Sequence, residues 1–290
     1  MIIIKYLLTL LYVFVSLGIS VYGAHCFVHL LRYLGKQKKA RRKLGREIES
    51  FHKAPPAMPF VTIQLPVYNE RQVIERLIES AANIDYPKEL FEIQVLDDST
   101  DDSQSLTEVL VERVKKRGIN IILLRRKDRH EFKAGALKAA LESAKGKYLA
   151  IFDADFVIPS NFLHRAIPLL ENDPRTACVQ GRWEHLNRNE NLITRAVSLG
   201  IDGHFLIEQG SRGFNNYFIN FNGTAGIWRK EAILEAGNWS GDTLTEDLDL
   251  SYRAQLAGYR IRYDQDLICP AEIPNTLNAF KSQQRRWAKG

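Results

Sequence analysis

Residues 148–155 read Tyr-Leu-Ala-Ile-Phe-Asp-Ala-Asp, an apolar run that ends in two carboxylates. The run 148–152 predicts a buried strand, because short apolar segments bounded by polar residues are typical of strands inside a parallel sheet. Working back toward the amino terminus, similar runs predict strands at 61–65, 92–96 and 119–124. Helical periods between them predict helices at 71–82, 103–116 and 134–144. Strand–helix alternation with short connections predicts an α/β fold: a mostly parallel sheet flanked by helices.

The second half of the chain is less regular. A strand at 177–183, a long helix near 192–209, a Gly/Asn-rich loop and a helix that starts near Glu246 are predicted there. No internal repeat and no low-complexity tract interrupts the sequence. The whole of 59–290 is therefore expected to form one domain.

Polar segments follow three of the predicted strands, at 66–70, 97–102 and 153–155. Ligands of open α/β sheets bind at the carboxyl ends of the strands, so these segments are expected to meet at one edge. Neither Gly-x-Gly-x-x-Gly nor Gly-x-x-x-x-Gly-Lys-Ser/Thr occurs in the sequence. We therefore expect carboxylates to hold a cation and the cation to hold phosphate. Alone, Asp153-Ala-Asp155 is equally compatible with a solvated loop or a helix cap.

Other polar residues invite the same chemistry and also have plain structural interpretations. Lys133 precedes a predicted helix, where a cation and helix amides can meet phosphate, or where a lysine is simply solvated. Thr245-Glu246-Asp247 opens a helix and offers either a cap or a base. Arg286 could clamp a diphosphate and Trp287 could offer a face to a sugar ring, or both could lie on a surface helix.

The amino-terminal segment predicts a membrane anchor. From 6 to 31 there is no Asp, Glu, Lys or Arg, and roughly 26 residues at about 1.5 Å each give about 39 Å of helix, enough to cross a hydrocarbon core of about 30 Å. A basic cluster follows: Arg32, Lys36, Lys38, Lys39, Arg41, Arg42, Lys43 and Arg46. By the positive-inside rule the remainder is cytoplasmic, and in a bacterium the membrane would be the inner one. A cleaved signal peptide is disfavoured, because its charges precede the apolar region.

Net charge and cysteine content exclude other classes. The formal net charge is +6, and the basic cluster exceeds it, so the rest of the chain is slightly acidic and offers no basic face to nucleic acid. The cluster is expected to lie on anionic lipid headgroups. Cys26, Cys178 and Cys269 are far apart and are expected to be reduced thiols. We expect a transmembrane helix at 1–34, a basic juxtamembrane linker ending in prolines at 35–58, and the catalytic domain at 59–290.

Seven motifs, in their order and spacing, resemble family-2 glycosyltransferases, and among these the cellulose-synthase-like branch. The motifs are Pro66-Val-Tyr68-Asn-Glu70, Asp97-Asp98-Ser, Phe-Lys133-Ala-Gly, Asp153-x-Asp155, Phe221-Asn-Gly-Thr-Ala-Gly226, Thr-Glu246-Asp247 and Gln283-x-x-Arg286-Trp287. The resemblance implies a GT-A fold and inverting transfer from a nucleotide-diphospho-sugar, UDP- or GDP-linked, with Mg²⁺ or Mn²⁺. Members of the branch continue past the last motif into membrane helices. A missing carboxy-terminal segment or a further membrane subunit is therefore expected.

The resemblance also implies roles for single residues. Around the nucleoside it places Tyr68, Glu70 and an aspartate of the Asp97-Asp98 pair. At the diphosphate and its metal it places Asp153, Asp155, Lys133 and Arg286. On the acceptor side it places the loop 221–226, which contains Gly223, together with Gln283 and Trp287. It makes Asp247 the general base and Glu246 a substrate-binding residue. The expected acceptor is a growing β-linked polysaccharide. A ceramide-type lipid acceptor, a nucleotidyltransferase and a truncated, non-catalytic membrane partner that binds donor are the alternatives.

Overall fold

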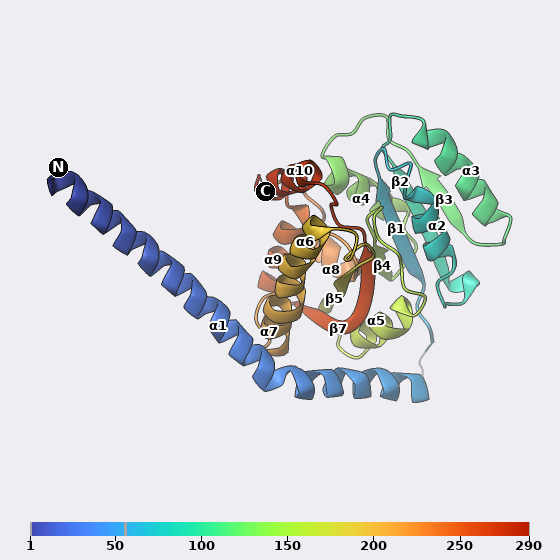
Figure 1. Cartoon of the computed structure of the whole chain (residues 1–290). Coiled ribbons are helices and arrows are strands. Elements are labelled where there is room, and N and C mark those ends of the chain that lie inside the picture. The colour runs from blue at the N-terminus through green and yellow to red at the C-terminus, as the bar shows by residue number, and fades with distance from the viewer. Residues whose placement is uncertain (1, 55–56, 290) are drawn as a thin grey trace.

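A computed structural model describes residues 2–54 and 57–289 (Figure 1). Within these residues the fold is built on one seven-stranded sheet with the order β3-β2-β1-β4-β6-β5-β7. The strands are β1 (Val61–Val67), β2 (Phe91–Asp97), β3 (Ile121–Leu124), β4 (Tyr148–Ile151), β5 (Thr176–His185), β6 (Gly226–Arg229) and β7 (Arg260–Ala271). All neighbours run parallel except β6, which is antiparallel to both β4 and β5. The sheet is thus mixed and mostly parallel, as predicted.

Helices cover both faces of the sheet. The helices after α1 (Ile2–Lys53) are α2 (Ile74–Ala82), α3 (Ser103–Lys115), α4 (Phe132–Ser143), α5 (Phe162–Glu171), α6 (Leu192–Asp202), α7 (Gly210–Phe214), α8 (Lys230–Glu235), α9 (Glu246–Leu256) and α10 (Leu277–Trp287), with a 3₁₀ turn η1 (Lys88–Leu90) and a π-helix η2 (Gly203–Gln209). Alternate residues of β4 belong to two hydrophobic cores, one on each face of the sheet. Tyr148 and Ala150 pack with α2, α3 and α5. Leu149 and Ile151 pack with α4, α8 and α9.

The first half of the domain follows the predicted elements, with every boundary within three residues of its predicted place. The predicted helix near 192–209 is longer, because α6, η2 and α7 follow one another without a break. Four elements of the second half were not predicted: α5, β6, α8 and β7. The surface helix considered for Arg286 and Trp287 is present as α10. Pro168 interrupts the helical pattern of α5, and β6 has only four residues. Short or interrupted patterns give a weak signal.

The range 35–58, expected as a linker after the membrane helix, is helical through Lys53. Helix α1 (Ile2–Lys53) is continuous over 52 residues. No proline precedes Pro55, so nothing before it has to end the helix. Figure 1 shows the amino-terminal part of α1 projecting away from the domain, while its later part runs along the domain.

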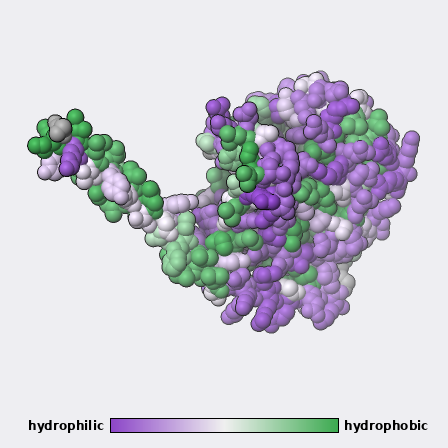
Figure 2. All heavy atoms as spheres, viewed as in Figure 1, coloured by the Kyte–Doolittle hydropathy of each residue, from purple (hydrophilic) through white to green (hydrophobic). Residues whose placement is uncertain are grey.

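The two parts of α1 have different surroundings. The projecting part carries hydrophobic residues along much of its length in Figure 2, and it is long and apolar enough to cross a membrane. The later part buries Tyr33, Ile48 and Phe51 against the domain with helical spacing. Arg41 donates to both carboxylate oxygens of Asp266 at 3.0 and 2.6 Å. The basic segment is therefore a docked helix, with apolar residues on the side that faces the domain.

Candidate active site

The carboxyl ends of β1, β2 and β4 lie next to one another at one edge of the sheet. Because β6 is antiparallel, its first residue, Gly226, pairs with Ile151 near the end of β4. The loop that leads into β6 therefore reaches the same edge. The backbone N–H of Asp153 donates to the hydroxyl of Thr224 in this loop at 2.8 Å. Two segments some seventy residues apart thus meet directly.

Lys133 joins these two segments. Its ammonium donates to Oδ1 of Asp153 and, at 2.9 Å, to the carbonyl oxygen of Gly223. Lys133 lies in the first turn of α4, after two residues with left-handed backbone, Glu131 and Phe132 (φ 57° and 44°). Burial works against its charged form, but the carboxylates of Asp153 and Glu246 outweigh burial and raise the pKa of Lys133. The side chain therefore stays a cation.

The predicted base lies on the other side of the loop. Asp247 belongs to the first turn of α9, and its Oδ1 accepts the N–H of Leu248 at 2.8 Å. A Cβ placed on Gly223 would lie only 3.2 Å from Oδ2 of Asp247 and 3.6 Å from the ammonium of Lys133. Burial raises the pKa of Asp247, and burial together with the Asp247 carboxylate raises that of Glu246. The loop, the lysine and the two acids form one compact cluster.

Asp155 and Glu70 add further negative charge to this edge. Burial and then the neighbouring Asp153 carboxylate raise the pKa of Asp155 to about 7. The same two causes raise the pKa of Glu70, while the charge of Arg286 opposes them. Carboxylates that resist ionisation because they are buried and also repel one another are suited to binding a cation.

The oxygen donors fit a divalent metal that also binds a ligand. No cluster of three or more His, Cys, Asp or Glu side chains could hold a metal ion within residues 2–54 and 57–289. Mg²⁺ is usually held by one or two carboxylates together with phosphate oxygens and water, so Asp153 and Asp155 suffice when a diphosphate supplies the rest.

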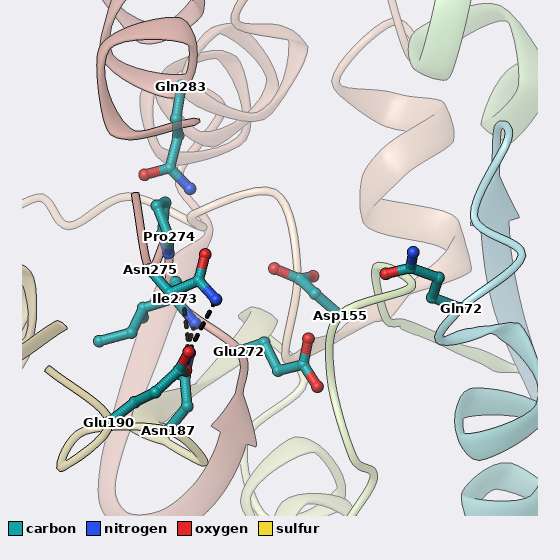
Figure 3. Close-up of a pocket in the computed structure, with 9 residues that line it drawn as sticks. All are labelled: Gln72, Asp155, Asn187, Glu190, Glu272, Ile273, Pro274, Asn275 and Gln283. Carbon is teal, nitrogen blue, oxygen red and sulfur yellow. Dashed lines mark hydrogen bonds between the residues drawn. The ribbon is translucent and has the colours of Figure 1, made fainter. Parts of the chain in front are cut away.

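A cavity of about 470 Å³ lies beside Asp155 (Figure 3). Its lining is mostly amide and carboxylate side chains: Gln72, Asp155, Asn187, Glu190, Glu272, Ile273, Pro274, Asn275 and Gln283. In Figure 3 the Asp155 carboxylate lies between Gln72 on one side and Gln283 on the other, with Glu272 below it. Oε1 of Gln283 is buried and has no hydrogen-bond partner among the described residues. A polar cavity of this kind suits a ligand rich in hydroxyl groups.

Comparison with known proteins identifies the architecture. The family model for glycosyl transferase family 2 matches residues 62–233. The chain belongs to this family. The glycosyltransferase is 43% identical over 236 residues to glucomannan 4-beta-mannosyltransferase 7 of Arabidopsis thaliana, covering 80% of this chain and 42% of that protein. It is 39% identical over 267 residues to the Arabidopsis glucomannan 4-beta-mannosyltransferase 9, covering 91% of this chain and 50% of the relative. The chain thus spans about half the length of these curated relatives.

Two solved structures share the fold of this glycosyltransferase. A mannosyltransferase from Pyrobaculum calidifontis, in complex with GDP-Man and Mn²⁺, superposes with a TM-score of 0.63 at 21% identity, covering 91% of this chain and 72% of that one. S. aureus TarS in complex with UDP-GlcNAc gives a TM-score of 0.56 at 17% identity, covering 76% and 60%. At these identities the likeness shows the fold, which is the expected GT-A fold.

The two aspartates of the Asp97-Asp98 pair have different surroundings in the structure. The Asp97 side chain has no exposed surface, and its oxygens accept the N–H of Ser99 at 3.0 Å and two N–H groups of Arg125 at 3.1 and 2.9 Å. Asp98 is held by two nitrogens of Arg126 and is 9% exposed. In this glycosyltransferase Asp97 therefore fixes the strand end and the loop after β3, and Asp98 is the aspartate of the pair that keeps exposed surface.

The arginines after β3 were not identified from the sequence. Besides Arg125 and Arg126, Arg129 lies over the ring of Tyr68 at 3.2 Å from its centroid. Two aspartates at the end of one strand, followed by two arginines after the next parallel strand, form a signal that could have revealed the pairs. At the other end of the chain, Arg286 and Trp287 lie exposed on α10, Trp287 by 47%.

Proposed function

We propose that the chain is the catalytic part of an inverting, membrane-anchored glycosyltransferase that moves a mannosyl group from GDP-mannose to a hydroxyl of a growing β-linked polysaccharide. The names of the relatives support the mannosyl group and the polysaccharide. The GDP-Man in the Pyrobaculum structure supports the donor. The family supports the reaction class.

The observation that carries the proposal is that the Lys133 ammonium contacts two chain segments, the end of β4 and the loop before β6. The start of α9, which bears the proposed base, lies beside that loop. Lys133 binds Asp153 and the Gly223 carbonyl, and Gly223 lies against Asp247. When the bond to the diphosphate breaks, negative charge develops on the leaving oxygen. Because Asp153 and the Gly223 carbonyl already hold the Lys133 ammonium in place, it would stabilise that charge without having to move during the reaction. Arg286, near enough to influence Glu70, would add a second positive charge.

Asp247 is the proposed general base. An acceptor hydroxyl must lose a proton as it attacks the anomeric carbon, and a carboxylate within hydrogen-bond reach can take it. Burial raises the pKa of Asp247 and so makes it a stronger base than an ordinary aspartate. Attack from the side opposite the diphosphate inverts the anomeric centre. Gln283 and Trp287 are proposed to shape the acceptor side, and Tyr68 and Glu70 the nucleoside side.

Asp155, with Asp153, is proposed to hold Mg²⁺ or Mn²⁺. The bound cation would neutralise the diphosphate of the donor and of the product. Asp155 contributes an oxygen donor whose proton affinity is already high, because burial and Asp153 disfavour its bare charge. Protons and metal therefore compete for this carboxylate.

We propose that residues 1–34 span a membrane, that 35–58 form the basic juxtamembrane segment, and that 59–290 form a cytoplasmic catalytic domain. The apolar part of α1 and the basic residues after it support this orientation. The docked part of α1 would hold the catalytic domain close to the membrane surface.

A donor screen with the purified chain tests the proposal. GDP-mannose, UDP-glucose and UDP-GlcNAc are each supplied with Mn²⁺ or Mg²⁺ and a β-1,4-mannooligosaccharide, and release of nucleoside diphosphate is measured. The expected result is metal-dependent GDP release that requires the acceptor. Release of pyrophosphate would indicate a nucleotidyltransferase instead. Absence of turnover with every donor would indicate a partner that does not catalyse transfer.

A further inference from the structure

The loop 221–225, whose Gly223 carbonyl accepts the Lys133 ammonium, is held by three polar side chains outside the family motifs: Gln180, His204 and Gln209. Asn222, which directly precedes Gly223, makes three hydrogen bonds. Its N–H donates to Oε1 of Gln180 at 2.9 Å, its Oδ1 accepts from Nε2 of Gln209 at 2.7 Å, and its Nδ2 meets Nε2 of His204 at 3.0 Å. The backbone of Gly223 has φ +80°, so the loop needs such fixed points to keep its shape.

The π-helix makes this arrangement possible. His204 and Gln209 are five residues apart in η2. In an α-helix of about 3.6 residues per turn, five residues rotate by about 140°, and the two side chains would point in different directions. In a π-helix residue i hydrogen-bonds to i+5, so these two positions lie nearly above each other and both reach Asn222. The unusual helix is thus placed where two of its side chains hold one loop residue.

The hydrogen bonds determine which atom carries each proton. Gln209 Nε2 also donates to the carbonyl oxygen of Asn220 at 3.0 Å, which fixes the Gln209 amide. Its remaining donor meets the oxygen of Asn222, so the Asn222 amide presents its NH₂ group to His204. Nε2 of His204 must then accept, and the ring proton must sit on Nδ1.

Glu208 supports this tautomer. Its Oε2 lies 3.1 Å from Nδ1 of His204, and its Oε1 lies 3.0 Å from a guanidinium nitrogen of Arg212. The hydrogen bond from His204 lowers the pKa of Glu208, which therefore stays ionised. An ionised carboxylate can only accept, so it requires N–H on the Nδ1 side of the ring.

We infer that His204, as the neutral Nδ1–H tautomer, is a positioning residue: through Asn222 it fixes the loop that presents the Gly223 carbonyl to Lys133 and borders Asp247. The predicted effect of His204 on sugar transfer rests on the proposed function. The His204 side chain is 32% exposed. In the proposed mechanism it does not contact the reacting groups. Its effect on transfer is transmitted by the loop.

Two variants separate hydrogen bonding from packing. The His204 ring also packs edge-to-face on Phe205 at 5.0 Å between centroids, so His204→Phe keeps a ring but removes the acceptor. His204→Gln removes the ring but keeps an acceptor that can reach the position of Nε2. We expect kcat for GDP-mannose to fall about tenfold in His204→Phe, with the donor KM within about threefold, because small displacements of positioned groups reduce the rate of the chemical step. We expect His204→Gln to stay within about threefold of the wild type in both constants.

A second measurement does not depend on turnover. Amide hydrogen exchange of a peptide spanning 219–226 should be faster in His204→Phe than in the wild type and unchanged in His204→Gln. The reverse pattern in kinetics or exchange, with Phe tolerated and Gln harmful, would assign His204 to packing and overturn the inference. Should the wild type transfer no sugar, the proposed function fails, and the exchange measurement still decides the role of His204.

Discussion

Gly223→Ala tests whether the loop and the proposed base are as close as the structure has them. Gly223 has φ +80°, and the left-handed region costs an L-residue about 1–2 kcal/mol. Alanine also restricts the unfolded chain, which offsets about 0.4–1 kcal/mol. The free energy of unfolding should therefore fall by only about 1 kcal/mol, and the variant should stay folded.

The effect on transfer should be larger. The new Cβ would lie 3.2 Å from Oδ2 of Asp247, so the carboxylate or the loop must move by a few tenths of an ångström. A misplacement of about 1 Å can lower a rate about 10²-fold, so we expect kcat to fall at least about tenfold. Chemical denaturation measures the stability, and GDP release from GDP-mannose measures kcat.

Gly118→Ala is the matched control. Gly118 has φ +75°, and a Cβ there would meet nothing within 4 Å. It should lose a similar amount of stability and keep its kcat. If Gly223→Ala transfers sugar as fast as Gly118→Ala, the contact with Asp247 has no catalytic importance and the reasoning is refuted.

Three further predictions concern charge in the site. The rate should fall as the pH decreases through the raised pKa of Asp247, since a protonated carboxyl cannot accept a proton. A profile of kcat/KM against pH that stays flat down to about pH 4, near the ordinary pKa of aspartate, would contradict this. Lys133→Met nearly keeps the length of the side chain but removes the cation that binds Asp153 and Gly223. In steady-state assays kcat/KM for the donor should therefore fall about 10²–10³-fold. A fall under threefold would argue against a role at the diphosphate. With GDP present to supply the diphosphate, adding Mn²⁺ should raise the melting temperature of the wild type further, and more at pH 8 than at pH 6 because protons compete for Asp155. Asp155→Asn should show little Mn²⁺-dependent shift in differential scanning fluorimetry, and an equal shift in both proteins would place the metal elsewhere.

The first half of the fold could be predicted because its strands are short apolar runs that end in polar residues. β1, β2 and β4 are of this kind, and in the sheet they run parallel and side by side in the order β2-β1-β4. The acids at their ends therefore had to meet at one edge. β6 could not be predicted in the same way, because four residues give no period, and its antiparallel direction depends on the path of the chain after α7.

The parts of the site that could not be predicted depend on contacts between distant segments. In the sequence Asp97 looks like a ligand-binding residue, but two nitrogens of Arg125 donate to its carboxylate. Recognising this pair requires knowing that β3 lies next to β2 in the sheet. The role proposed for His204 depends on a π-helix, which no propensity indicates. The docked part of α1 looked like a linker, because its basic residues hide the helical spacing of Tyr33, Ile48 and Phe51.

The most direct test of the central proposal is Asp247→Asn, assayed for acceptor-dependent mannosyl transfer and for GDP-mannose binding. The substitution keeps the shape of the side chain and removes its capacity as a base. The account predicts that kcat falls about 10²–10⁴-fold while the dissociation constant for GDP-mannose with Mn²⁺ changes by less than about threefold. Transfer at the wild-type rate by a variant that still binds the donor would contradict it.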